Sequence, residues 1–232
     1  MELKGKVALI SGGGSGIGLA IARGLTKEGV HTILASRRYD LVSKRAKELS
    51  SSTKSIAIEV DIRSKSSIER AMERVWSEFS TVDILINNSG VGTDALAVDL
   101  AESEWDRVIE TNLKGAFLLS QAVLPKMIAN RRGHIINISS QAGKHGYANA
   151  TAYCASKFGL IGFGLALQEE VRSHNIKVNN LLPALVQVPP PEESGQVRQG
   201  VLQVEDLAET VVFLCKQPER VKIEDIGLYN FA

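Results

Sequence analysis

An apolar run, a glycine-rich turn and the start of a helix follow one another in Val7-Ala8-Leu9-Ile10-Ser11-Gly12-Gly13-Gly14-Ser15-Gly16-Ile17-Gly18-Leu19-Ala20. Glycines let backbone N–H groups approach a ligand without a Cβ in the way, and the helix that follows directs its positive N-terminal end at an anion. The strict G-x-G-x-x-G spacing is absent, because glycines 12, 16 and 18 give G-x-x-x-G-x-G. The turn predicts a phosphate-binding site, and a purely structural turn is the alternative.

Short apolar runs and helical patterns succeed one another along the rest of the chain. The runs are rich in β-branched residues and nearly continuous, as expected of parallel strands covered on both faces. The predicted strands are Val7–Ile10, Thr32–Leu34, Ile56–Val60, Ile84–Ile86, Ile135–Ile138, Ile176–Leu182 and Ile226–Tyr229. The predicted helices are Ile17–Glu28, Asp40–Leu49, Lys65–Phe79, Glu104–Ala129, Thr151–His174 and Val204–Leu214. We therefore expect one α/β domain over residues 1–232, with a Rossmann-type, doubly wound, mostly parallel seven-stranded sheet and helices on both faces.

The composition argues against several other classes of protein. The 232 residues include 27 Lys and Arg and 26 Asp and Glu, a formal net charge of +1 that gives no reason to propose nucleic acid or an anionic membrane as partner. No apolar stretch approaches the ~18 residues of a membrane span, and the N-terminus lacks a signal-peptide pattern. Cys154, Cys215 and four dispersed histidines form neither a disulfide framework nor a metal-ligand motif. We expect a cytoplasmic protein without a metal site.

Tyr153 and Lys157 lie four residues apart on a predicted helix and therefore share one face of it. A free phenol has a pKa near ~10 and is a poor base at neutral pH, but a cation one turn away favours the phenolate. Such a tyrosine can donate a proton to a carbonyl oxygen or accept one from an alcohol, and the Ser140 hydroxyl could bind the same oxygen. The alternative is an ordinary pair on a helix surface.

Together these residues resemble the short-chain dehydrogenase/reductase family over nearly the whole chain. Ser11–Gly18 matches the family's T-G-x-x-x-G-x-G motif, Asn87-Asn88-Ser89-Gly90 matches N-N-A-G, and Tyr153–Lys157 matches Y-x-x-x-K. Asn112 and Ser140 complete the pattern. The resemblance implies an oxidoreductase that transfers a hydride between NAD(P)(H) and a carbonyl or secondary alcohol carbon of a small molecule.

By this resemblance, the catalytic residues are Asn112, Ser140, Tyr153 and Lys157. Tyr153 is expected to be the acid/base and Ser140 to bind the substrate oxygen. Lys157 would lower the pKa of Tyr153 and bind the ribose, and Asn112 would hold a water that leads to Lys157. The implied cofactor-binding residues are Ser11, Gly12, Ser15, Gly16, Ile17, Gly18, Ser36, Arg37, Arg38, Asp61, Ile62, Asn88, Gly90, Tyr153, Lys157, Pro183 and Val186.

The residues at the end of the second predicted strand bear on the choice of cofactor. NAD-selective relatives tend to have an acidic residue near position 36, whereas this chain has Ser36-Arg37-Arg38. Two guanidinium groups suit a ribose 2′-phosphate. We expect NADP as cofactor, with NAD possible, and two solvated arginines as the alternative interpretation. Asp61 is expected to bind the adenine beside the Ile62 backbone.

Three features depart from the family pattern. Ala184 replaces the glycine that usually follows Pro183, and Val188 replaces a threonine whose hydroxyl bonds the cofactor. The segment between Val188 and Val204 is short and begins with three prolines, and the residues after them, Glu192-Glu193-Ser194-Gly195-Gln196, are polar and have no apolar stripe. The usual glycine pair near the C-terminus is missing. Because so polar a segment has little area to bury, we expect a loose lid and an enzyme of broad selectivity.

Two other functions and an assembly follow from the same resemblance. The alternatives are a 3-oxoacyl-thioester reductase that acts on an acyl-carrier protein, and a dinucleotide-binding regulator without turnover. All four catalytic positions are present, which disfavours the regulator. Family members similar to this one pair the equivalents of helices Glu104–Ala129 and Thr151–His174 with symmetry mates, so we expect a homo-oligomer, either a dimer or a tetramer.

Overall fold

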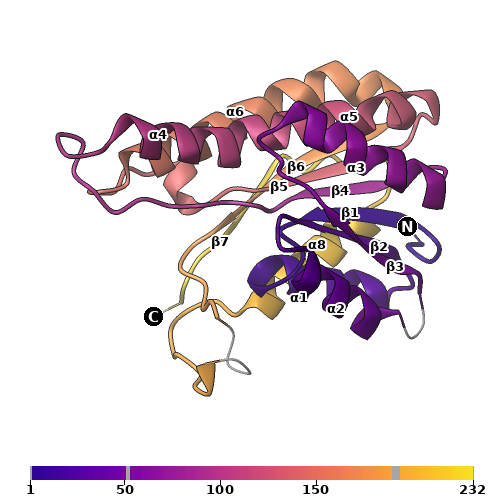
Figure 1. The fold of residues 1–232 in the computed structure, drawn as a ribbon, viewed down its shortest axis with the longest axis horizontal. Helices are drawn as coiled ribbons and strands as arrows, with labels where there is room; N and C mark the ends of the chain where they lie inside the picture. Colours follow the sequence, from indigo (N-terminus) through magenta and orange to yellow (C-terminus); the bar gives the residue numbers. More distant parts are fainter. Residues whose placement is uncertain (1, 51–52, 190–193, 232) are drawn as a thin grey trace.

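A parallel sheet runs through the computed structural model, which describes residues 2–50, 53–189 and 194–231 (Figure 1). The seven strands lie in the order β3-β2-β1-β4-β5-β6-β7, and every adjacent pair is parallel. The strands are β1 Val7–Ser11, β2 His31–Ser36, β3 Ser55–Glu59, β4 Ile84–Asn87, β5 Gly133–Ile138, β6 Ile176–Pro183 and β7 Asp225–Leu228. The predicted fold class is confirmed, and the sheet is wholly rather than mostly parallel.

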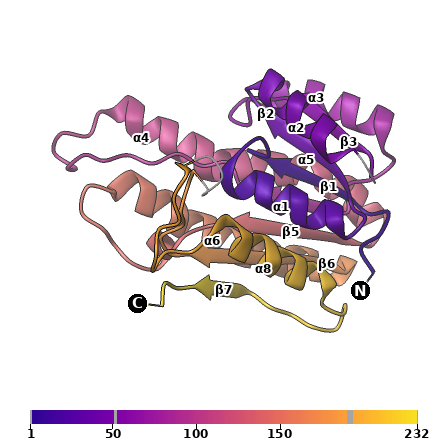
Figure 2. The ribbon, with the colours of Figure 1, turned by 90° about the horizontal axis from the view of Figure 1, so that it is seen from below.

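Helices cover both faces of this sheet. In Figure 2, α1 and α8 lie across one face. The helix α2 lies beside them, and the bounds of the three helices are α1 Gly16–Lys27, α2 Tyr39–Leu49 and α8 Val204–Lys216. The opposite layer consists of α3 Lys65–Glu78, α4 Glu102–Ile109, α5 Gly115–Ala129 and α6 Thr151–Val171. Short helical turns lie at Gln141–Gly143 (η2) and Arg172–His174 (η3).

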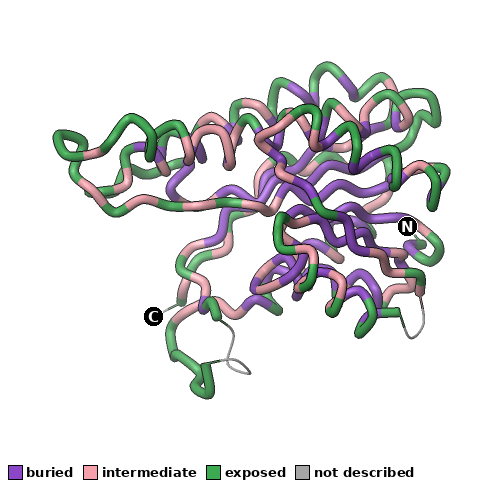
Figure 3. The backbone as a smooth tube through the Cα atoms, viewed as in Figure 1, coloured by how far each residue is buried: buried purple, intermediate pink, exposed green. Residues whose placement is uncertain are grey.

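The sheet separates two apolar clusters, which explains the continuous apolar character of its strands. All five residues of β1 are buried. Ile10 packs into the cluster under α1, α2 and α8, whereas its neighbour Leu9 packs into the cluster under α3, α5 and α6. Figure 3 shows the buried strands between two layers whose outer surfaces are exposed. Because successive strand side chains point to opposite faces, a strand covered on both sides is apolar at most positions, and its buried polar residues, such as Ser11 at the end of β1, need hydrogen-bond partners.

The predicted helix Glu104–Ala129 is wrong in one respect, because an irregular segment divides it. Between α4 and α5 the chain forms a five-residue π-helix, η1, at Glu110–Lys114. Asn112 lies within it and is buried. A wider turn changes the direction in which its side chains point, and such turns occur frequently at functional sites. Periodicity in the sequence does not distinguish this turn from regular helix.

The order of the strands determines where a ligand can bind. The chain crosses from one side of β1 to the other between β3 and β4, so β1 and β4 are neighbours whose following helices lie on opposite faces. In open parallel sheets, ligands bind in the crevice outside the carboxyl ends of the strands at such a point. No helix in the described residues is long and apolar enough to cross a membrane.

Candidate active site

Two adjoining cavities occupy the carboxyl ends of the strands. The first, of about 400 Å³, lies over the ends of β1, β2 and β3 and is called the polar cavity. The second, of about 710 Å³, lies between η2, α6 and the segment after β6 and is called the apolar cavity. Both are lined by Ile17, Asn88, Gly90, Val91 and Val188. One extended ligand can therefore span both cavities.

The glycine-rich turn forms the floor of the polar cavity. Gly12 and Gly16 line it and have positive φ values of 67° and 52°. Gly18 does not line it; a Cβ at Gly18 would lie 2.4 Å from the carbonyl oxygen of Gly12, so Gly18 lets α1 approach the turn. Ser15, at the N-cap of α1, makes no side-chain capping bond, so the first N–H groups of the helix are free of that partner. This arrangement suits an anion.

Ser11 has a structural position at the end of β1, and its expected contact with a cofactor stays a prediction. It is buried and lines neither cavity. Its Oγ accepts from the backbone N–H groups of Asn88 at 2.9 Å and Ser89 at 3.0 Å, while Asn88 Nδ2 donates to the Ser11 carbonyl at 2.9 Å. Ser11 therefore joins the end of β1 to the loop after β4, and thereby places Asn88 at the boundary of the two cavities.

Arginines surround the far end of the polar cavity. Arg37 and Arg38 line it as expected, together with Ser36 and Ile62. The Arg38 guanidinium donates to Ser15 Oγ at 3.3 Å, so the second strand and the glycine-rich turn meet around the cavity.

Arg63 is a third guanidinium that the sequence analysis missed. It lines the polar cavity and forms a bidentate pair with Asp61, with distances of 3.0 Å from Nε to Oδ1 and 2.7 Å from Nη2 to Oδ2. The hydrogen bond from Arg63 lowers the pKa of the Asp61 carboxyl. Asp61 thus lines the cavity with its carboxylate already paired. A basic residue two positions after Asp61 was the signal available in the sequence.

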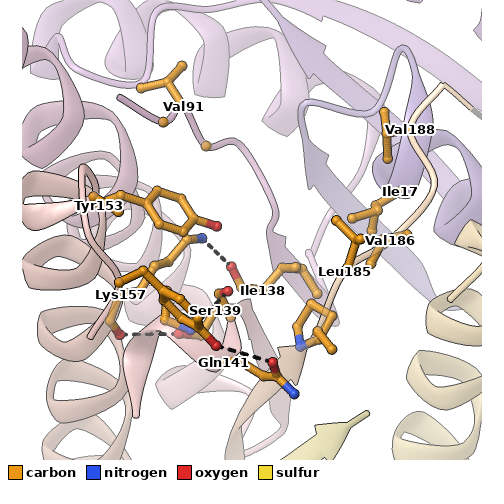
Figure 4. Close-up of a pocket in the computed structure, with 18 of the residues that line it drawn as sticks. Ile17, Val91, Ile138, Ser139, Gln141, Tyr153, Lys157, Leu185, Val186 and Val188 are labelled. Atoms are coloured by element: carbon orange, nitrogen blue, oxygen red, sulfur yellow. Dashed lines mark hydrogen bonds between the residues drawn. The ribbon is translucent and has the colours of Figure 1, made fainter. Parts of the chain in front are cut away.

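The two central residues of the apolar cavity come from one face of α6, as their spacing predicted. Figure 4 shows Tyr153 and Lys157 facing Leu185, Val186 and Val188 across the cavity. The Lys157 ammonium lies 5.6 Å from the centre of the Tyr153 ring and donates to the Ile138 carbonyl at 2.7 Å. This bond holds the lysine against the end of β5.

Burial sets the protonation of both groups. It lowers the pKa of Lys157 to about 8, because the neutral amine is favoured away from water. It also raises the pKa of the Tyr153 phenol, and hydrogen bonding with the Ser140 side chain opposes that change. The expected lowering of the Tyr153 pKa by Lys157 stays a prediction for the enzyme with its ligands bound.

Asn112 lines neither cavity, although it lies next to both. Its Oδ1 accepts from Val91 N–H at 2.8 Å, and its Nδ2 donates to the Val91 carbonyl at 2.9 Å and to Ser156 Oγ at 3.0 Å. Both amide N–H groups are thus used in fixing the loop after β4 against α6. A water on the remaining lone pair of Oδ1 stays a prediction; a Cβ at Gly90 would lie 3.5 Å from that oxygen and 3.6 Å from Lys157 Nζ.

The segment after β6 closes the other side of the apolar cavity. This segment contributes Pro183, Ala184 and Val186 to the lining, and Val188 also lines the polar cavity. A Cβ added at Gly16 would lie 3.2 Å from a methyl carbon of Val188, so the two residues are in close contact. The expected loose lid falls partly on residues 190–193, which lie outside the described residues.

The described residues on either side of that gap are tied together by Gln187. Its side chain is buried, donates to Ser194 Oγ at 3.1 Å and accepts from Arg198 N–H at 2.8 Å. The sequence did not predict this anchor, because a glutamine in a polar stretch gives no sign of burial.

The fold and the site together define a class of protein. The polar cavity lies at the crossover point of a parallel sheet and is lined by a glycine-rich turn, a helix N-terminus without a side-chain cap and three arginines. Such a cavity suits a dinucleotide. Beside it, Tyr153, Ser140 and Lys157 line a cavity that can accept a small molecule. This combination is that of a nucleotide-dependent oxidoreductase.

Comparisons with known proteins agree with this class. The family model for short chain dehydrogenases matches residues 6–197. A 3-oxoacyl-(acyl-carrier-protein) reductase of Thermotoga maritima is 35% identical over 227 residues, which cover 92% of each chain. The crystal structure of a metagenomic short-chain oxidoreductase in complex with NADP aligns over 100% of both chains with a TM-score of 0.88 and 32% identity. The X-ray structure of an alcohol dehydrogenase of the archaeon Thermococcus sibiricus, complexed with 5-hydroxy-NADP, aligns over 98% of this chain and 97% of its own with a TM-score of 0.89 and 26% identity.

The chain belongs to the short-chain dehydrogenase family. It is an oxidoreductase of that family, and the resemblance that its motifs predicted is confirmed.

Proposed function

We propose that this protein is an NADP(H)-dependent reductase of carbonyl compounds, or the corresponding alcohol dehydrogenase, and that it acts as one domain. The observation that carries this proposal is the adjacency of the two cavities. Tyr153, Ser140 and Lys157 line the apolar cavity, while the glycine-rich turn and three arginines line the polar one. The cavity that would bind the nucleotide and the cavity that would bind the reacting carbonyl therefore adjoin at Asn88 and Gly90, which line both.

The residues of the polar cavity fit NADP(H). The uncapped N-terminus of α1 and the positive-φ glycines suit a pyrophosphate. Arg37 and Arg38 suit a ribose 2′-phosphate, since a guanidinium can donate two parallel hydrogen bonds to it. Two similar solved structures contain NADP or 5-hydroxy-NADP, which supports the same cofactor here. When bound, the reduced nicotinamide would supply the hydride.

The chain itself would supply the proton and the position of the substrate. The Tyr153 phenol would donate its proton to the carbonyl oxygen as the alcohol forms, and the Ser140 hydroxyl would hold that oxygen. Ser140 Oγ also accepts from the Ala142 N–H at 3.1 Å, which fixes the position of the hydroxyl beside Tyr153. Lys157, held by Ile138, would bind the ribose hydroxyls and bring positive charge to the phenol.

A panel of ketones and aldehydes with NADPH and NADH tests this function. We expect loss of absorbance at 340 nm with NADPH and at least one uncharged ketone, and a higher kcat/KM for NADPH than for NADH. Binding of NADPH without oxidation in the presence of any carbonyl would favour the non-catalytic regulator. A higher kcat/KM for NADH would mean that the arginines do not select the cofactor.

A 3-oxoacyl-thioester reductase is the second candidate. Several curated relatives at 35% to 38% identity have this activity in their names. The same assay distinguishes it: a 3-oxoacyl-carrier-protein substrate would have to exceed the simple ketones in kcat/KM by about tenfold or more.

We also propose a homo-oligomer, either a dimer or a tetramer, in the cytoplasm. Large apolar side chains are exposed on the helices expected to pair: Phe117 on α5 is 43% exposed and Phe158 on α6 is 49% exposed. Cys154 and Cys215 are both free thiols, which suits a reducing compartment. Light scattering at micromolar concentration tests the assembly, and a monomeric mass would contradict it.

A further inference from the structure

The apolar cavity contains a polar pair that the proposed mechanism does not use. Gln141 and Tyr147 both line this cavity, and the Tyr147 hydroxyl donates to Gln141 Oε1 at 3.4 Å. Figure 4 shows Gln141 at the end of the cavity opposite Val91 and Val188, beyond Ser139. Because Val91 and Val188 also line the polar cavity and Gln141 does not, Gln141 lies at the end of the apolar cavity that the distal part of a substrate would reach.

The bond from Tyr147 fixes which atom of Gln141 is available. The backbone carbonyl of Gln141 already accepts from Lys144 and His145, both at 2.9 Å, and its Oε1 accepts from Tyr147. Its Nε2 has no acceptor among the described residues. An amide whose oxygen is held by a donor presents its two N–H groups to the cavity, so the matching group on a ligand is a hydrogen-bond acceptor.

The charges around the cavity define the rest of the ligand. Among the described residues that line it, none has a guanidinium, imidazole or carboxylate group, and the ammonium of Lys157 is turned to the Ile138 carbonyl. The undescribed residues 190–193 contain no basic side chain in the sequence. A carboxylate or phosphate placed here would lose its hydration without gaining a cation, which is strongly unfavourable. The walls are mainly aliphatic, with Ala142, Ala150, Leu185 and Val186 among them.

We propose that Gln141, positioned by Tyr147, determines substrate specificity, and that the substrate is an uncharged carbonyl compound with an apolar body and a second hydrogen-bond acceptor. The proposal rests on the proposed function and deepens it. Ser140 and Gln141 are consecutive residues, so one substrate can present its reacting oxygen to Ser140 and its second acceptor to Gln141.

Three substrates of similar length test this proposal with NADPH: 2-heptanone, methyl levulinate and levulinate. They provide a ketone alone, a ketone with an uncharged second acceptor, and a ketone with a carboxylate. We expect methyl levulinate to exceed 2-heptanone in kcat/KM by about threefold to tenfold, the effect of one hydrogen bond. Levulinate should fall at least about tenfold below its ester, because the carboxylate must be desolvated.

Variants of Gln141 and Tyr147 test whether this pair causes the preference for methyl levulinate over 2-heptanone. Gln141→Leu should reduce the ratio of ester to ketone to about one, mainly by raising KM for the ester. Tyr147→Phe should reduce it partly, because the amide loses its fixed orientation. Gln141→Glu, which removes the donor and adds a negative charge, should reduce it and weaken levulinate further. Gln121→Leu, at an exposed glutamine of α5 that lines neither cavity, is the matched control and should keep the wild-type ratio.

The outcomes separate this proposal from the proposed function. An unchanged ratio in Gln141→Leu, or levulinate turned over as well as its ester, would overturn the specificity role while carbonyl reduction stands. NADPH binding with no oxidation by any carbonyl would instead overturn the proposed function itself.

Discussion

The two cavities differ in the physical means by which each would bind a ligand. The polar cavity combines backbone N–H groups at a helix end with the guanidinium groups of Arg37, Arg38 and Arg63. The apolar cavity has aliphatic walls, one buried lysine and a few hydroxyl and amide groups. A charged ligand of constant structure can be bound by fixed dipoles and cations near solvent. A small carbonyl compound is instead selected by shape and by few hydrogen bonds, which residues such as Gln141 can change without altering the first cavity.

The sharpest test of this division removes the proposed proton donor of the apolar cavity. Tyr153→Phe should lower kcat by about 100- to 10,000-fold, the usual contribution of a general acid or base. Fluorescence titration with NADPH should give a Kd close to that of the wild type, because the polar cavity is intact. Tyr229→Phe, at a tyrosine that is 55% exposed and lines neither cavity, is the control. Unchanged turnover in Tyr153→Phe would contradict the mechanism.

Lys157 allows a measurement of how much a buried ammonium group beside the apolar cavity lowers the free energy of unfolding. Its pKa is about 8 in the folded chain and 10.5 ordinarily. Between these values the unfolded chain holds a proton that the folded chain has released, so the free energy of unfolding rises with pH across this window. Across the whole window, the contribution of Lys157 to the rise in the free energy of unfolding is about 3 kcal/mol.

Urea unfolding without cofactor at pH 8 and pH 10 measures about 2 kcal/mol of this contribution, as the difference between the wild type and Lys157→Met. The wild type should gain stability relative to the variant as the pH rises. Parallel pH profiles for the two proteins would show that the buried ammonium is not destabilising.

Removing an arginine from the polar cavity should affect one cofactor far more than the other. We expect Arg37→Ala or Arg38→Ala to lower kcat/KM for NADPH by about tenfold or more, because each loses a charge-assisted hydrogen bond. The value for NADH should change by no more than about twofold. Arg23→Ala, at an exposed arginine of α1 that lines neither cavity, controls for net charge. Equal losses with both cofactors would mean that these arginines do not contact the 2′-phosphate.

The smallest expected effect lies at the boundary of the cavities. Val188 lines both and packs against the Gly16 turn. Val188→Thr places a hydroxyl there with nearly the same shape, and we expect NADPH to bind about threefold more tightly through one added hydrogen bond. Isothermal titration calorimetry can measure this, with Val98→Thr, at a residue 87% exposed, as the control. Weaker binding would indicate that the apolar contact itself holds the nucleotide.

Strand positions and the pairing of Tyr153 with Lys157 were predictable from the sequence because they depend on local rules. Burial on both faces makes a strand continuously apolar, as in β1, and four-residue spacing places Tyr153 and Lys157 on one face of α6. The π-helix around Asn112 and the division of Glu104–Ala129 were not predictable, since a wider turn leaves the apolar pattern nearly unchanged.

The sequence by itself determined the order of strands and helices, the glycine-rich turn and the identity of the candidate catalytic residues. Only the tertiary structure decided that Ser11 bonds the loop after β4 instead of lining a cavity, and that Arg63 pairs with Asp61. It also decided that the Gln141 side chain accepts a hydrogen bond from Tyr147 in the apolar cavity. The physical reason is the range of the interactions. Periodicity and backbone conformation act between near neighbours in the chain, whereas the direction of a polar side chain depends on which partners the folded sheet brings to its carboxyl edge.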